Sequence, residues 1–192
     1  FNQRLYIVFV KKFKFKLKIM IHWWKIDIRN KKVLSNIKSS IQNQNISQGI
    51  ITSKLEKQIA KALGVNYVVL TNSGTIALLM SMIVLKLKKG DEIILPNCGW
   101  ISPVHAAILL GLKIKLVDVQ QNSPVICMKS LKKAINKKTK AIIPIHLNGK
   151  YAETSEIKKI IKNKNIHIIE DSAQALFSKN KNVFIGTEGD IG

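Results

Sequence analysis

Two short polar segments that follow apolar runs carry the residue types best suited to bind a charged ligand. Ser73-Gly74-Thr75 comes soon after the run Tyr67-Val68-Val69-Leu70, and Asp171-Ser172-Ala173-Gln174 follows the run at residues 167–170. Open α/β sheets bind their ligands just beyond the carboxyl ends of their strands. We therefore expect both segments to lie at one edge of a sheet and to face a common ligand.

The first segment has the features of a phosphate site. Gly74 lets the backbone approach an anion closely, the start of the following helix presents free N–H groups, and Thr75 adds a hydroxyl donor. Ser and Thr are also the ordinary capping residues of helices. Taken alone, the segment is explained more simply by capping than by ligand binding.

The second segment has the features of a site for a heteroaromatic ring. A carboxylate such as Asp171 beside a pyridine nitrogen favours the protonated ring, which then acts as an electron sink. The amide of Gln174, three residues on, can donate a hydrogen bond to a ring hydroxyl. The alternative, that Asp171 only caps a short helix, has equal weight for this residue alone. A phosphate at one segment and a pyridine ring at the other together indicate pyridoxal 5′-phosphate.

Two further side chains lie just past apolar runs. Trp100 follows Pro96-Asn97-Cys98-Gly99, where an aromatic ring can stack on a flat cofactor. A core or interface tryptophan is the simpler interpretation for that residue alone. His146 ends an apolar run and is interpreted as a structural histidine, with a role in supporting the site as the alternative. The sequence shows no cluster of histidines and carboxylates, so we expect no metal site.

The elements that must position these residues alternate between strands and helices, which predicts a mostly parallel sheet with right-handed crossovers. The continuous Ile/Val/Leu runs indicate strands covered on both faces. The expected fold is therefore α/β, a three-layer sandwich. Expected strands are 67–70, 92–95, 113–119, 141–145 and 167–170; expected helices are 33–41, 53–63 (opened by a capping box, Ser53 and Glu56, and closed by Gly64), 76–87, 102–110, 128–135 and 153–163.

The composition is that of a globular protein with a strong positive charge. The 192 residues are 46% hydrophobic and carry a formal net charge of +21 at pH 7. Arg occurs only at positions 4 and 29, and there is no cluster of Arg with aromatic residues, so we expect no nucleic-acid partner. No apolar run approaches the ~20 residues of a membrane span. Cys98 and Cys127 show neither a disulfide framework nor metal spacing, which favours a reducing, cytoplasmic location.

The domain organisation predicted from the sequence has three parts. Residues 1–19 form an uncertain extension, for which we favour translated upstream sequence before a natural start at Met20 over an edge strand or a surface-bound segment. Residues 20–50 form a segment with a short helix. Residues 51–192 form a cofactor-binding large domain that is incomplete.

Taken together, the motifs resemble the DegT/DnrJ/EryC1/StrS family of sugar aminotransferases, which have the type I aspartate aminotransferase fold. The resemblance runs from about Trp23 to Gly192, and the order and spacing of its motifs agree throughout. The motifs are Ser47-Gln48-Gly49, Ser73-Gly74-Thr75-x-Ala77-Leu78, residues 90–96 (GDEIILP), residues 111–119 (GxxxxxVDV), residues 139–149 (TKAIIPIHLNG), residues 169–175 (IEDSAQA) and residues 186–192 (GTxGDIG).

The resemblance implies a role for each candidate site residue. Gly74 and Thr75 would hold the phosphate of pyridoxal 5′-phosphate, and Trp100 would stack on its ring. Asp171 would pair with the pyridine nitrogen as the catalytic residue within this chain. Gln174 would meet the ring hydroxyl.

The resemblance also implies a reaction and its partners. The family moves an amino group, commonly from glutamate or glutamine, onto a keto sugar that is usually nucleotide-linked, in polysaccharide or deoxyamino-sugar biosynthesis. Its members are homodimers. Their Schiff-base lysine lies beyond the position of Gly192, which implies that this chain is the N-terminal half of an enzyme. A family branch with histidine in place of that lysine acts as a sugar dehydratase, and a noncatalytic remnant is the other alternative.

Overall fold

The computed structural model describes residues 31–162 and 164–192. The predicted extension at residues 1–19 and the first part of the segment at 20–50, residues 20–30, lie outside the described residues. The chain divides into two compact units, residues 1–47 and residues 48–192. The described part of the first unit contains α1 (Lys31–Gln42), which corresponds to the short helix expected at 33–41. The three-part domain organisation stays a prediction.

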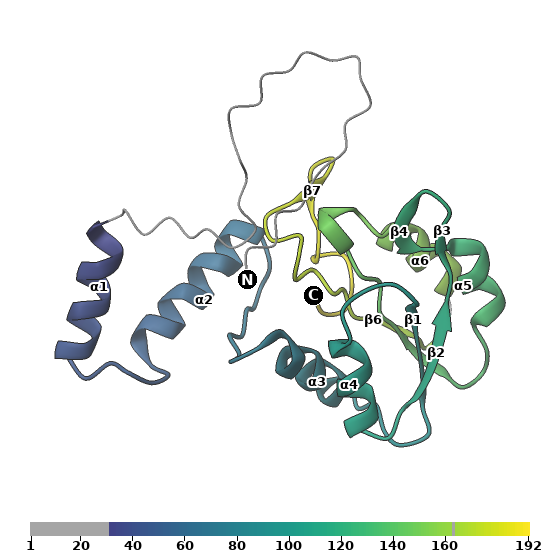
Figure 1. The fold of residues 1–192 in the computed structure, drawn as a ribbon, viewed down its shortest axis with the longest axis horizontal. Coiled ribbons are helices and arrows are strands. Elements are labelled where there is room, and N and C mark those ends of the chain that lie inside the picture. The colour runs from purple at the N-terminus through teal and green to yellow at the C-terminus, as the bar shows by residue number, and fades with distance from the viewer. Residues whose placement is uncertain (1–30, 163) are drawn as a thin grey trace, which may run out of the picture. The chain divides into compact units, whose positions relative to one another are not determined.

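A four-stranded parallel sheet forms the centre of residues 48–192 (Figure 1). Its strands are β1 (Glu92–Pro96), β2 (Lys113–Val117), β5 (Thr139–Ile142) and β6 (His167–Ile168), in the order β2-β1-β5-β6. All three pairings in this sheet are parallel. The carboxyl ends of the four strands therefore meet at one edge, and the expected α/β class is confirmed.

Helices cover both faces of the sheet, which gives the three layers predicted from the sequence. The helices α3 and α4 contribute to the apolar core on one face, and α5 and α6 contribute to the core on the other. Within this unit the helices are α2 (Ile50–Leu63), α3 (Gly74–Val84), α4 (Ser102–Leu109), α5 (Met128–Ala134), α6 (Thr154–Ile161) and the 3₁₀ turn η1 (Leu147–Gly149).

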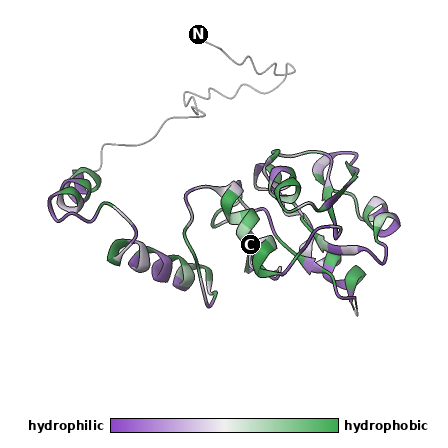
Figure 2. Ribbon diagram, turned by 90° about the horizontal axis from the view of Figure 1, so that it is seen from below, coloured by the Kyte–Doolittle hydropathy of each residue, from purple (hydrophilic) through white to green (hydrophobic). Residues whose placement is uncertain are grey.

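The alternation of side chains along each strand divides the core between the two faces. Ile93 and Leu95 belong to the core under α3 and α4, whereas Ile94 between them belongs to the core under α5 and α6. Ile142 and Ile143 divide in the same way. Because successive strand residues point to opposite faces, a strand buried on both sides must be apolar throughout. Figure 2 shows the matching pattern on the helices, which carry both hydrophobic and hydrophilic residues.

Two expectations for the start of this unit are wrong. Residues 67–70 form no strand, and Tyr67 and Val69 are exposed, because no strand lies beside them among the described residues. Ser53 and Glu56 form no capping box, because α2 begins three residues earlier, at Ile50. Glu56 instead accepts a hydrogen bond at 2.9 Å from the backbone N–H of Leu70. Helix α2 does end as expected, at Gly64 in the left-handed conformation.

Two hairpins were not expected from the sequence. The segment expected as one strand at 113–119 ends as β2 at Val117, and β3 (Val119–Gln120) then pairs antiparallel with β4 (Ser123–Ile126). Near the end of the chain, β7 (Lys179–Asn180) pairs antiparallel with β8 (Val183–Phe184). Both are short two-stranded ribbons outside the central sheet.

Candidate active site at the carboxyl edge of the sheet

The starts of α3 and α4 lie side by side and are joined through their hydroxyls. Ser73 caps α3, since its Oγ accepts a hydrogen bond at 3.3 Å from the N–H of Ile76. Capping therefore explains Ser73 but not Thr75, whose Oγ1 lies 2.9 Å from Oγ of Ser102 at the start of α4. A Cβ placed on Gly74 would meet no atom within 4 Å, so the first turn of α3 is open to an approaching ligand. Ser102 was not singled out from the sequence.

The loop that carries Trp100 packs against the segment that carries Asp171. A Cβ placed on Gly99 would lie 2.6 Å from Cδ1 of Ile145, so the Gly99 backbone sits directly on that side chain. Ile145 in turn forms a parallel β-bridge with Asp171. The Trp100 side chain is 74% exposed, which rules out the core interpretation and leaves its ring free to stack. These contacts, together with that between Thr75 and Ser102, place the starts of α3 and α4 and the Asp171 segment along the same edge.

We expect Gly99→Ala to lower the free energy of unfolding by about 1–3 kcal/mol. The φ angle of Gly99 is 156°, in a region that residues with a Cβ rarely adopt, and the added methyl would have to displace Ile145. Urea denaturation measures the change. Gly49→Ala is the control, because its added Cβ would meet no atom within 4 Å and should cost little. Equal stability of both variants would contradict the close contact between the Trp100 loop and Ile145.

The main chain of Asp171 is fixed by the neighbouring strand end. Its N–H donates to the carbonyl of Pro144 at 2.9 Å, and its carbonyl accepts from the N–H of His146 at 3.0 Å. Its Oδ1 accepts from the N–H of Ala173 at 3.2 Å, while Oδ2 has no hydrogen bond within the described part of the chain. The residues from 172 to 192 contain turns and the β7–β8 hairpin but no helix. The helix-capping alternative for Asp171 is therefore wrong.

The amide of Gln174 is oriented by a backbone contact. Its Oε1 accepts a hydrogen bond at 2.7 Å from the N–H of Asn148, which lies in the 3₁₀ turn η1. Because the oxygen is used in this way, Nε2 is the end left to donate. Gln174 is exposed, so this donor can reach a ligand.

A buried carboxylate that the sequence analysis did not single out lies directly before Asp171. Glu170 is 2% exposed and accepts four hydrogen bonds. His146 Nε2 and Thr154 Oγ1 lie 3.0 and 2.7 Å from Oε2, and the N–H groups of Glu188 and Gly189 lie 2.8 and 2.6 Å from Oε1. The one sequence signal that could have identified this network is a lone glutamate at the end of an apolar run.

His146 has both ring nitrogens engaged, which confirms its interpretation as a structural histidine. Its Nδ1 accepts from the N–H of Ala152 at 3.1 Å, so Nε2 must carry the proton that is donated to Glu170. The ring is fully buried and stacks on Tyr151, with centroids 5.9 Å apart. The contact with Glu170 is therefore a hydrogen bond from a neutral imidazole to a carboxylate.

The pKa of Glu170 is lowered from its ordinary value. Burial by itself raises that pKa, since it disfavours the charged form, but the hydrogen bonds from His146, Thr154 and Gly189 together outweigh burial. Glu170 is thus a charged carboxylate at neutral pH, held by donors on three different segments. Burial is also the largest cause of a raised pKa for Tyr151, whose hydroxyl donates to Glu188 at 3.0 Å.

Within residues 31–162 and 164–192, no group of three or more His, Cys, Asp or Glu side chains is placed to hold a metal ion. No helix in the same residues is long and apolar enough to cross a membrane. Cys98 and Cys127 are free thiols.

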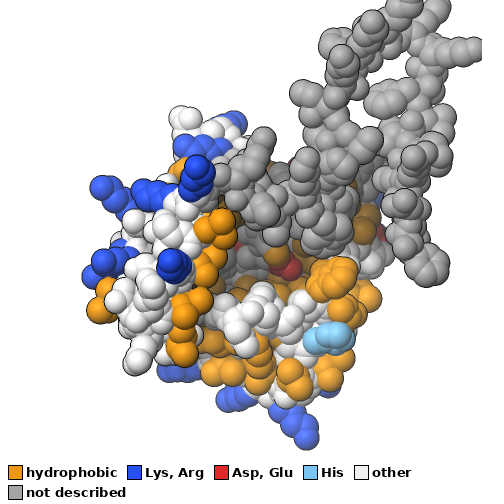
Figure 3. All heavy atoms as spheres, turned by 60° about the vertical axis from the view of Figure 1, so that its left-hand side comes forward, with side chains coloured by type: hydrophobic (Ala, Val, Ile, Leu, Met, Phe, Trp, Pro, Cys, Tyr) orange, Lys and Arg blue, Asp and Glu red, His pale blue; other side chains and the backbone are white. Residues whose placement is uncertain are grey.

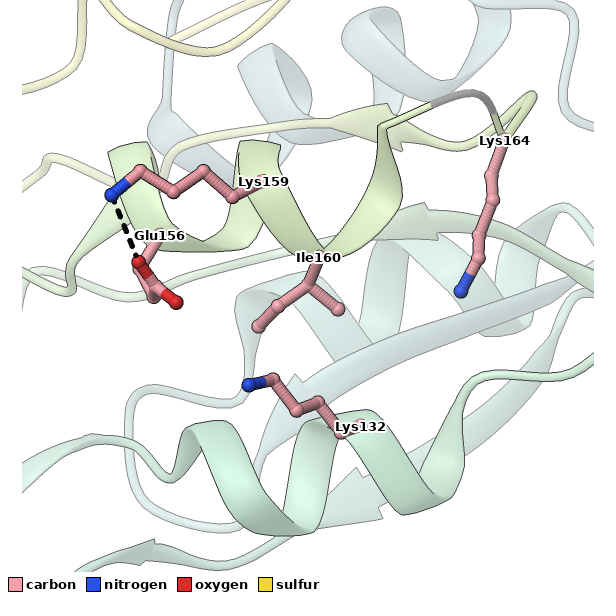
Figure 4. Close-up of a pocket in the computed structure, with 5 residues that line it drawn as sticks. All are labelled: Lys132, Glu156, Lys159, Ile160 and Lys164. Carbon is pink, nitrogen blue, oxygen red and sulfur yellow. Dashed lines mark hydrogen bonds and ion pairs between the residues drawn. The ribbon is translucent and has the colours of Figure 1, made fainter.

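A pocket of about 400 Å³ lies between α5 and α6, away from the candidate site (Figure 4). Lys132 and Lys164 extend into the same space on either side of Ile160, and Lys159 pairs with Glu156 at 3.2 Å. A neighbouring pocket of about 410 Å³ surrounds the amino ends of β5 and β6 and shares Lys164. These pockets lie toward the opposite edge of the sheet from Asp171. Their lysines offer positive charge but none of the groups expected to bind a pyridine ring.

Comparison with known proteins agrees with this geometry. Residues 27–192 match the model of the DegT/DnrJ/EryC1/StrS aminotransferase family. The chain belongs to this family. The resemblance deduced from the sequence motifs is thereby confirmed, and the structural neighbours described next carry the same fold.

Members of the DegT/DnrJ/EryC1/StrS family that resemble the chain include enzymes of two kinds. It is 34% identical over 162 residues to GDP-4-keto-6-deoxy-D-mannose 3-dehydratase of Escherichia coli O55:H7, covering 81% of this chain and 42% of the relative. It is 33% identical over 145 residues to GDP-perosamine synthase of Escherichia coli O157:H7, and this match covers 76% of this chain and 40% of the relative. The chain therefore spans about two fifths of the length of these relatives.

A solved structure of such a dehydratase contains a bound cofactor adduct in a similar fold. The crystal structure of GDP-4-keto-6-deoxymannose-3-dehydratase with a trapped PLP-glutamate geminal diamine matches with a TM-score of 0.78 and 33% sequence identity. The match covers 81% of this chain and 42% of that one. This chain thus shares its three-layer α/β fold with a relative whose crystal structure contains a pyridoxal phosphate adduct.

Proposed function

We propose that this chain supplies the cofactor-binding part of a pyridoxal-phosphate-dependent aminotransferase that acts on a keto sugar. Three contacts support the proposal together. Thr75 contacts Ser102, the Gly99 backbone packs on Ile145, and Ile145 forms a β-bridge with Asp171. Along the carboxyl edge of the parallel sheet these contacts connect hydroxyls at two helix starts, the loop of an exposed tryptophan and a carboxylate. That edge is where open α/β sheets bind ligands.

The available groups fit pyridoxal 5′-phosphate at both ends. The open first turn of α3 at Gly74 and the Thr75 hydroxyl suit the phosphate. Asp171 Oδ2 is free to accept from a protonated ring nitrogen, and Gln174 Nε2 is free to donate to the ring hydroxyl. The exposed ring of Trp100 suits stacking.

Each residue then has a defined task in the reaction. The bound cofactor supplies an electron sink for carbanion chemistry. Asp171, the catalytic residue of this chain, holds a proton on the ring nitrogen because its negative charge favours the cationic ring. Gln174 and Trp100 fix the plane of the ring, and the start of α3 holds the phosphate so that the ring cannot slide along the edge.

We propose a nucleotide-linked keto sugar as the substrate and glutamate or glutamine as the amino donor, in polysaccharide or deoxyamino-sugar biosynthesis. Both named relatives carry GDP-linked sugars in their names, and the solved dehydratase contains a glutamate adduct. A sugar dehydratase of the same family is the second candidate, because the chain resembles one dehydratase and one synthase to nearly the same degree. A noncatalytic remnant is the third.

The free thiols fit a reducing, cytoplasmic setting.

Product analysis of the whole protein that contains this chain tests the proposal. The protein is incubated with pyridoxal phosphate, glutamate and GDP-4-keto-6-deoxymannose, and the sugar product is identified by mass spectrometry. An amino sugar formed together with 2-oxoglutarate supports an aminotransferase. A deoxygenated keto sugar would assign the dehydratase instead, and no turnover of any nucleotide-linked keto sugar, with the cofactor bound, would favour the remnant.

We propose that the working form is a homodimer, and we expect the chain itself to associate. Hydrophobic side chains gather on one face of the molecule (Figure 3). The exposed apolar residues of α3 and α4 are Met80, Ile83, Val84, Ile108 and Leu109. Exposed apolar surface of this kind marks an interaction site or a tendency to aggregate. Sedimentation velocity should show a mass that rises with concentration, and Ile83→Lys with Leu109→Lys should reduce it. A stable monomer at all concentrations would contradict the expectation.

A further inference from the structure

We infer that Glu170 is a positioning residue for Asp171, and the inference rests on the proposed function. The Glu170 side chain is buried and faces away from that of Asp171, because adjacent residues of an extended segment point to opposite faces. Ile169 lies in the core under α3 and α4, and Ile168 lies in the core under α5 and α6. The Asp171 side chain is therefore on the same face as that of Ile169, toward α3 and α4. The Glu170 side chain is on the same face as that of Ile168, toward Thr154 at the start of α6.

The path from Glu170 to Asp171 runs through His146. The imidazole Nε2 donates to Glu170 Oε2 at 3.0 Å, while the backbone N–H of the same histidine donates to the carbonyl of Asp171 at 3.0 Å. The N–H of Asp171 is held by Pro144, two residues before His146. The strand end that fixes the Asp171 main chain is therefore itself fixed by the Glu170 carboxylate.

The second anchor of Glu170 lies on the opposite side of its own strand. Oε1 accepts from the N–H groups of Glu188 and Gly189 at 2.8 and 2.6 Å. The backbone of Glu170 also donates to the carbonyl of Ile191 at 2.8 Å, so the segment 188–191 is joined to it three times. A Cβ placed on Gly189 would lie 2.8 Å from the carbonyl oxygen of Ile168, which shows how closely this segment approaches the strand.

Only a charged carboxylate satisfies this arrangement. All four partners are donors, and a carboxylate is the side chain that accepts on every side. Glutamine would turn an NH₂ group toward two of the four donors. We expect the strand ends at 144–146 and 170–171 to shift as a result, so that Asp171 no longer meets the pyridine nitrogen at hydrogen-bond distance.

The experiment measures the protonation of a bound pyridine ring and not activity. The probe is pyridoxamine 5′-phosphate labelled with ¹⁵N in the ring, which has no aldehyde to react with the many lysines. Its ring ¹⁵N chemical shift is recorded across a pH titration on the wild-type chain, Glu170→Gln and Asp171→Asn. We expect both variants to lower the pKa of the bound ring nitrogen by about 1 unit or more, which is a tenfold change in proton affinity.

Two controls separate positioning from loss of folding. Glu92→Gln alters a carboxylate that also binds a threonine hydroxyl, at 3.0 Å from Thr139, but at the amino end of β1. It should leave the ring titration unchanged. If Glu170→Gln does not fold, Thr154→Val is used in its place, since this change removes the 2.7 Å hydrogen bond from the Thr154 hydroxyl to Oε2 of Glu170. Thr154→Ser should then restore the wild-type titration.

The outcomes distinguish this inference from the proposed function. A wild-type ring titration in Glu170→Gln, or in Thr154→Val if that variant is needed, together with a shifted titration in Asp171→Asn, would overturn the positioning role alone. An unchanged titration in Asp171→Asn would overturn the cofactor site itself. A merely structural role for Glu170 would reduce the folded fraction but leave the ring titration of the folded, ligand-bound chain as in wild type, which also contradicts the inference.

Discussion

Replacing Asp171 with asparagine is expected to weaken binding of pyridoxamine 5′-phosphate by about 10- to 100-fold. Hydrogen bonds to charged groups are worth about 1.5–3 kcal/mol, and asparagine keeps the shape of the side chain while losing its charge. The main-chain bonds of Asp171 to Pro144 and His146 do not involve the side chain, so the fold should be retained. Isothermal titration calorimetry measures the affinity.

Asp91→Asn is the matched control for this change. Its Oδ2 accepts a short-range hydrogen bond at 3.0 Å from the N–H of Lys88, as Asp171 does from Ala173, but it lies before the amino end of β1. We expect the Asp91→Asn variant to bind pyridoxamine 5′-phosphate with the same affinity as the wild type. A loss of the same size in both variants would show that net charge and not the position of Asp171 governs binding. In an active form of the whole protein, Asp171→Asn should also remove most turnover.

Replacing Glu170 with alanine is expected to lower the free energy of unfolding by about 3–5 kcal/mol, the range for removing one partner of a buried charged network. Four donors would lose their acceptor, among them the imidazole of His146 and the hydroxyl of Thr154. Urea denaturation at pH 7 measures the change. Glu156→Ala is the control, because Glu156 pairs with Lys159 at the surface and should contribute less than about 1 kcal/mol.

The same network predicts how stability depends on pH. Because the pKa of Glu170 is lowered on folding, its charged form stabilises the native state above the ordinary glutamate pKa. That contribution falls as the pH drops through the lowered value. The difference in free energy of unfolding between wild type and Glu170→Ala should therefore shrink between pH 7 and pH 3. A difference that stays constant or grows on acidification would contradict the lowered pKa.

The central part of the fold follows from the apolar pattern along the chain. Runs such as Ile93-Ile94-Leu95 alternate between two cores, and only a sheet covered on both faces requires every residue of a strand to be apolar. The run at residues 67–70 has the same composition but forms no strand. A strand needs a neighbour as well as a pattern, and composition does not report on the neighbour.

The candidate site was predicted from the sequence in part. Gly74, Thr75, Trp100, Asp171 and Gln174 were named because each lies just after an apolar run, and their assignment to a cofactor stays a proposal. The run before Gly74 and Thr75 forms no strand, so the start of α3 and not a strand end positions these two residues. Ser102 and Glu170 were missed for different physical reasons. The partner of Ser102 is 27 residues away in the chain, and Glu170 looks like part of the strand until the donors from three other segments are seen around it.

The proposed cofactor site is tested most directly by mapping where pyridoxamine 5′-phosphate binds on the ¹⁵N-labelled chain. Amide chemical shifts are followed by NMR as the ligand is added up to millimolar concentration. We expect saturable shifts concentrated at residues 74–75, 99–102 and 171–174, all with one dissociation constant. Shifts concentrated at Lys132, Lys159 and Lys164 around the pocket between α5 and α6, or no saturable shifts at the carboxyl edge of the sheet, would contradict it.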